Sequence, residues 1–107
     1  MEKAGGIKMK IEFSPSLKKR TIEFCDDELN YHINDSGCAW EYHNEITSQI
    51  EIVVLLGEKD MAERYVDDYM GYLKEELEDT YYSDDKKNLK SCIKSLEKLT
   101  NSLFNGA

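Results

Sequence analysis

The spacing of apolar residues changes near residue 44, and this change most constrains what the chain can fold into. In "IKMKIEF", residues 7–13, apolar and polar residues alternate strictly, as they do along a half-buried β-strand. The segments "RTIEF", "LNYHIN" and "CAWEYH" continue the alternation. The turn-forming segments "SPS" and "NDSG" precede the first and the last of them, and "CDDE" breaks the alternation between the first two. Residues 7–43 are therefore predicted to form a small antiparallel β-meander of three to four strands.

The following segment, "NEITSQIEIVVLLG", fits two structures. As a helix it would be capped by Asn44 and would end at Gly57. As a strand, its β-branched residues would suit a central position covered on both faces. We favour the helix for residues 44–56 and keep the strand as the alternative.

Beyond residue 57 the apolar residues recur at helical spacing. Asp60 and Glu63 have the spacing of a capping box, which marks the start of a helix. The apolar stripes of the two expected helices are Ala62, Val66, Met70, Leu73 and Leu77, and then Leu89, Ile93, Leu96 and Leu103. Residues 1–107 are thus predicted to form one α+β domain, in which two or three helices of the helical part (44–104) pack on one face of the sheet.

The charge of the chain is strongly negative and unevenly distributed. The net charge is −8. Residues 58–85 contain eleven acidic and three basic residues, whereas residues 86–107 contain five lysines and one glutamate. A negative field disfavours direct binding of nucleic acid or of anionic membranes, and it favours a partner protein with a basic surface.

One acidic stretch, "YVDDYMGYLKEELEDTYYSDD" (residues 65–85), contains five of the seven tyrosines. On a helix, Tyr65, Tyr69 and Tyr72 would form a row beside the apolar stripe. The acids that border this row are Asp68, Glu75, Glu76 and Asp79. The row is either buried against the rest of the fold or exposed as a binding face, with the tyrosines as anchors and the acids as a charged rim.

The cysteines and histidines are candidates for metal ligands and for nucleophile pairs. Cys25, His32, Cys38 and His43 are weak zinc candidates, because their spacing lacks the close pairs of structural zinc sites. An odd number of scattered cysteines indicates free thiols in a reducing, cytoplasmic environment. No catalytic residue is singled out and no cofactor is expected, since no nucleophile, oxyanion or phosphate-binding motif is recognised.

The sequence therefore predicts a small acidic, non-enzymatic cytoplasmic protein that binds and blocks another protein. Inhibitors, immunity proteins, antitoxins and phage-encoded blockers are of this class. In the most specific form of this hypothesis, the acids imitate the phosphates of a nucleic acid. The first alternative is a homo-oligomeric structural or regulatory module, such as a homodimer in which the tyrosine row meets its own copy. The second alternative is a small zinc-stabilised domain.

Overall fold

The computed structural model describes residues 14–104, and within this range the chain forms helices and no strand. The elements in order are α1 (Pro15–Asn30), the π-helix η1 (Tyr31–Asp35), the 3-10 helix η2 (Ala39–Tyr42), α2 (His43–Leu55), α3 (Lys59–Asp79) and α4 (Ser83–Phe104). The predicted α+β fold with a β-meander is therefore wrong. The first predicted strand, residues 7–13, lies outside the described residues.

Helix α1 covers the predicted strand "RTIEF" and the first two residues of the predicted strand "LNYHIN", the rest of which lies in η1. Ser14 caps it, because its hydroxyl accepts a hydrogen bond from the Leu17 amide at 3.0 Å, and Pro15 follows at the first helical position. Cys25, Leu29 and, one turn beyond, Ile33 are buried, which is a spacing of four residues and not of two. The alternation in "RTIEF" covered too few residues to distinguish the two periods.

Two glycines with positive φ mark the ends of helical segments. Gly37 (φ 77°) follows η1, and Gly57 (φ 92°) follows α2, a backbone conformation that other residues adopt at a cost. The predicted helix at residues 44–56 and the role of Gly57 are confirmed. The predicted caps are wrong, since Asn44 and Asp60 lie inside the helices that begin at residues 43 and 59.

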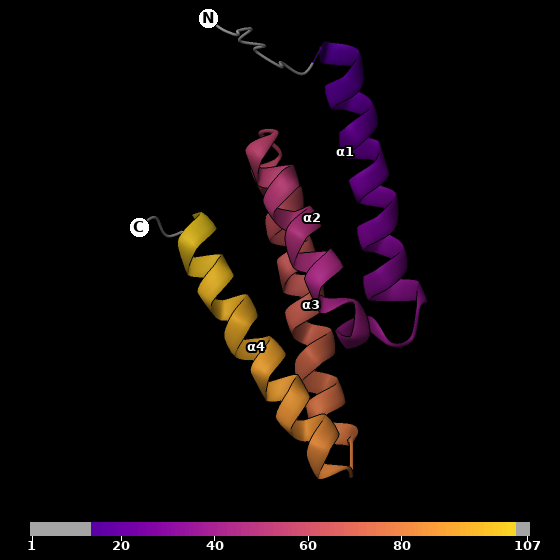
Figure 1. Ribbon diagram of the computed structural model, residues 1–107, viewed down its shortest axis with the longest axis vertical. Helices are drawn as coiled ribbons and strands as arrows, with labels where there is room; N and C mark the ends of the chain where they lie inside the picture. The colour runs from indigo at the N-terminus through magenta and orange to yellow at the C-terminus, as the bar shows by residue number, and fades with distance from the viewer. Residues whose placement is uncertain (1–13, 105–107) are drawn as a thin grey trace, which may run out of the picture.

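The helices form a bundle with α2 and α3 between α1 on one side and α4 on the other (Figure 1). Helices α3 and α4 form a long antiparallel hairpin, and residues 80–82 connect them at one end of the molecule (Figure 1). The fully buried side chains of the core come from all four α-helices: Cys25, Leu29, Ile46, Ile50, Val53, Tyr69, Leu73, Leu89 and Leu96. The two apolar stripes predicted for α3 and α4 face this core, with Met70 and Leu77 half-buried at its margin.

Among the described helices, none combines the length and the apolar composition that crossing a membrane requires.

Candidate functional site

Tyr65 ties α3 to α1 from inside the bundle. Its side chain is 4% exposed, and its hydroxyl donates to the Asp26 carboxylate and lies 3.1 Å from the Asp26 carbonyl oxygen. Burial and the adjacent Asp26 raise the pKa of Tyr65 to about 12. Arg64 approaches the same carboxylate at 3.8 Å. In this position the tyrosine holds two helices together and is not available as an anchor for a partner.

Tyr69 forms the buried end of a hydrogen-bonded relay that runs through His43 to Ser95 and joins three helices. Its side chain is fully buried, and its hydroxyl lies 2.7 Å from Nδ1 of His43 at the start of α2. Nε2 of the same imidazole lies 3.1 Å from the Ser95 hydroxyl of α4. Burial lowers the pKa of His43 and raises that of Tyr69, because desolvation disfavours the charged form of each.

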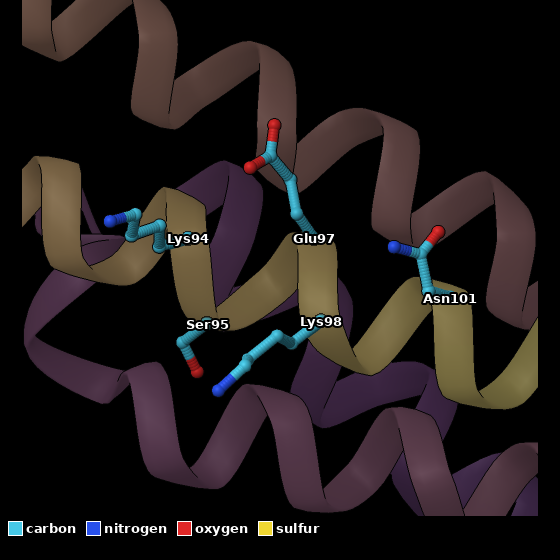
Figure 2. A pocket seen from close by; sticks show the side chains of 5 residues that line it. All are labelled: Lys94, Ser95, Glu97, Lys98 and Asn101. Carbon is cyan, nitrogen blue, oxygen red and sulfur yellow. The ribbon is translucent and has the colours of Figure 1, made fainter.

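The exposed end of this relay opens on α4. Ser95 lines a shallow surface hollow together with Lys94, Glu97, Lys98 and Asn101 (Figure 2). Ser95 and Lys98 extend to one side of α4, whereas Glu97 and Asn101 extend to the other (Figure 2). All five lining residues belong to α4, so the hollow does not enclose a ligand between two elements. The relay itself holds α2, α3 and α4 together.

Tyr72, the last residue of the predicted row, is half-buried, and its ring stacks on that of Tyr69 with centroids 6.4 Å apart. Burial raises the pKa of Tyr72. Of the four bordering acids, Asp68, Glu75 and Asp79 are exposed and Glu76 is half-buried. The structure thus keeps the predicted carboxylates on the surface while it withdraws the tyrosines toward the core.

The four zinc candidates do not converge. Cys25 is buried in α1, and Cys38 precedes η2 with its thiol facing the Ser36 carbonyl. His32 lies 3.3 Å from the Glu28 carboxylate and stacks on Tyr42, while His43 belongs to the Tyr69 relay. Among the described residues, no three His, Cys, Asp or Glu side chains are placed to hold one metal ion.

The two most exposed tyrosines of the described residues lie elsewhere, in the connection between α3 and α4. Tyr81 is 93% and Tyr82 is 71% exposed. The backbone around them is held in place, since the Tyr82 carbonyl accepts from the Lys86 amide at 3.0 Å. We define the α3–α4 tip as these two tyrosines and the two acids on either side: Glu78, Asp79, Tyr81, Tyr82, Asp84 and Asp85.

Sequence reasoning included the tip in the acidic stretch but gave its tyrosines no role. The signal that could have found them is the break in helical spacing at "TYYSDD", because connections between helices lie on the surface. A helical row says only which residues share a face, and the neighbouring helices decide whether that face is exposed.

Two of the four acids at the tip oppose the dipole of their own helix. Asp84 and Asp85 lie in the first turn of α4, where negative charge is favourable. Glu78 and Asp79 lie in the last turn of α3, which contains no basic residue. Carboxylates at that end of a helix interact unfavourably with the partial negative charge of its free carbonyls. These two acids therefore do not contribute to the stability of α3.

A second surface feature lies beside the tip, where α3 and α4 meet. It is a hollow of about 550 Å³ lined by Leu77, Lys87, Lys90, Ser91, Ile93 and Lys94, and we call it the lysine groove. Leu77 and Ile93 are half-buried and form its floor, and the lysines are exposed around them. The hollow combines an apolar floor with a cationic rim.

Comparison of the chain with protein-family models, with curated proteins and with solved structures finds no match.

Proposed function

We propose that this protein binds a basic surface of another protein through the α3–α4 tip and acts by covering that surface. The observation that carries the proposal is the pair of adjacent tyrosines, Tyr81 and Tyr82, held in the solvent between two pairs of acids. Tyrosine offers a large and rigid contact area at a low cost in side-chain entropy, and it is enriched among residues that dominate binding energy. In this proposal Tyr81 and Tyr82 of the tip are the anchors, in place of the row that was predicted from the sequence. The proposed binding surface is still acidic.

The placement of the acids supports the same function. Glu78 and Asp79 reduce the stability of α3 by their position at its C-terminal end. Natural proteins depart from local stability rules mostly where function requires it. A basic partner would neutralise these carboxylates, and their field would speed its approach.

The outward side of α3 extends the acidic surface away from the tip. The exposed carboxylates of α3 are Asp60, Glu63, Asp67, Asp68, Glu75, Glu78 and Asp79. They span about 28 Å at 1.5 Å per residue, so they are far sparser than the charges of duplex DNA. The proposal therefore centres on protein recognition at the tip, and imitation of a nucleic acid is tested separately below.

The test is a pull-down from a nuclease-treated lysate of the organism that encodes the chain, with wild-type protein and two variants. The tip variant is Tyr81→Ser/Tyr82→Ser, and the control is Tyr31→Ser, which removes a tyrosine that is 50% exposed on another part of the surface. Wild type and control should retain the same protein, high salt should release it, and the tip variant should lose it.

Circular dichroism and urea unfolding must first show that both variants fold. This is expected for Tyr81 and Tyr82 because they are largely exposed, whereas the Tyr31 ring is half-exposed and contacts that of His32. Retention of the same protein by all three chains would show that the tip is not the binding surface. If excess duplex DNA competes with the chain for the retained partner, the covered surface is a nucleic-acid site. If DNA does not compete, the nucleic-acid-mimicking version is excluded.

A further inference from the structure

The lysine groove has the chemistry to receive a segment that is both aromatic and acidic. Its rim consists of the exposed Lys87, Lys90 and Lys94, and its floor of Leu77 and Ile93. A small anion would satisfy the rim and leave the apolar floor in water, whereas an apolar peptide would leave the lysines without partners. An occupant that covers both parts needs carboxylates beside large apolar rings.

The α3–α4 tip of the same chain has this composition. Tyr81 and Tyr82 are the two most exposed aromatic residues of the described chain, and the acids Asp79 and Asp84 flank them. Each tip could place a ring on the floor of a groove and its carboxylates against the lysines of the rim. The two surfaces are thus complementary in charge and in apolar character.

A molecule cannot fill its own groove with its own tip. The connection between the helices is held by the hydrogen bond from the Lys86 amide to the Tyr82 carbonyl and by a contact of 3.4 Å from the Tyr82 amide to the Thr80 hydroxyl. Leu77 and Lys87 follow within one or two turns on the helices that this connection joins. Tip and groove are therefore neighbours at one end of the hairpin, and only a second copy can bring one onto the other.

We propose that two copies of this chain associate about a two-fold axis at this end, each placing its tip on the lysine groove of the other. The contact would be made twice in one closed dimer, as two-fold symmetry requires. The inference rests on the tip being a binding surface, as the proposed function does, and it names the groove of a second copy as a basic surface that fits it. Because the dimer covers the tip, a basic partner protein would compete with self-association.

The experiment is sedimentation velocity of the purified chain over a wide range of concentrations, at about 0.05 M and about 0.5 M NaCl. At low salt the mass should rise with concentration from 12.4 kDa toward twice that value, and high salt should shift the equilibrium toward the monomer. The groove variant Lys90→Glu/Lys94→Glu should raise the dissociation constant at least about tenfold, since each reversed charge turns an attraction into a repulsion. The matched control is Lys98→Glu, which reverses a lysine on the same face of α4 outside the groove and should change the constant little.

A mixing experiment tests the reciprocal geometry directly. The tip variant Asp79→Lys/Asp84→Lys should not self-associate, and neither should the groove variant. When the two variants are mixed, a mixed dimer should form, because wild-type tip meets wild-type groove at one contact and the two reversed surfaces meet at the other. Recovery of dimer on mixing also shows that both variants are folded.

A wild-type chain that stays monomeric at all concentrations would overturn the inference, and so would a dimer weakened equally by the groove variant and by Lys98→Glu. The two proposals can fail separately. The groove variant retains the tip and should still capture the partner protein in the pull-down. If the dimer forms as described but the Tyr81→Ser/Tyr82→Ser variant still retains its partner in the pull-down, only the proposed function is contradicted.

Discussion

His43 shows most clearly how a polar residue can hold this bundle together. From the start of α2, its two ring nitrogens form hydrogen bonds with the Tyr69 hydroxyl of α3 and with the Ser95 hydroxyl of α4. A charged imidazole at this site would lose solvation and gain no carboxylate partner, which is why its pKa is lowered from the ordinary 6.5. The neutral form of His43 is therefore favoured in the folded protein.

This gives a pH dependence with a definite sign. The unfolded chain takes up a proton on His43 near pH 6.5, whereas the folded chain resists protonation to lower pH. The contribution of His43 to stability is therefore complete above about pH 6.5 and decreases as the pH falls below it. Comparison of wild type with His43→Gln by urea unfolding removes the contribution of the many carboxylates, which both proteins share.

We expect the wild type to be more stable than His43→Gln by about 1–3 kcal/mol near neutral pH, because the variant leaves the buried Tyr69 hydroxyl poorly paired. The difference should shrink steadily between about pH 7 and about pH 5. A difference in the free energy of unfolding that stays constant over this range would show that His43 is not held neutral by burial.

The sequence did not show whether the row of Tyr65, Tyr69 and Tyr72 is buried or exposed, because the burial of each tyrosine depends on its individual contacts. The partner of Tyr65 is Asp26, and the partner of Tyr69 is His43. Asp26 lies between two segments that were predicted as strands, and His43 ends a third, so no helical neighbour was expected for the row. The burial of a side chain depends on residues distant in sequence, and a single stretch of sequence does not contain them.

At the scale of elements, α1 is where the sequence misled most. Ile22 and Phe24 alternate with polar residues as in a strand, yet Phe24 is 59% exposed in the structure. Cys25 and Leu29 are buried instead, and they lie at helical spacing. The Ser14 cap and Pro15 at the first position were available in the sequence as helix signals, but the proline was read as a turn. In contrast, α3 and α4 were predictable because each repeats its apolar period over about four turns.

The two ends of the α3–α4 connection differ in how their acids affect stability. Replacing Asp79 by Asn removes an unfavourable charge from the end of α3, so it should stabilise the protein by about 0.3–1 kcal/mol. Replacing Asp84 by Asn removes a favourable charge from the start of α4, so it should destabilise the protein by a similar amount.

Urea unfolding of the two variants at low salt measures both effects, and high salt should reduce both. If the tip binds a basic partner, Asp79→Asn should weaken binding even though it stabilises the fold. Two variants that shift stability in the same direction would contradict the assignment of these acids to opposite helix ends.

At the scale of the whole molecule, charge is divided between the two helices of the hairpin. α3 carries eight acids and three bases, whereas α4 carries five lysines and three acids, two of them in its first turn. The sequence indicated this division correctly, together with the helical part from residue 44 onward. It could not indicate that the fold lacks a sheet between residues 14 and 43, nor that the division would place a cationic groove beside an acidic tip.

The tyrosines divide into buried residues that join helices, such as Tyr65 and Tyr69, and exposed residues that are free to bind, Tyr81 and Tyr82. The measurement that tests this most directly is acetylation of the folded protein by N-acetylimidazole, mapped by mass spectrometry for each tyrosine. At about 0.5 M NaCl and low protein concentration, where the proposed dimer is dissociated, Tyr81 and Tyr82 should react far faster than Tyr65 and Tyr69. All four should react alike in protein unfolded by guanidinium. If Tyr65 or Tyr69 is acetylated as fast as Tyr82 in the folded protein, this division is wrong. The row would then be exposed, and nothing would favour the tip over it as the binding surface.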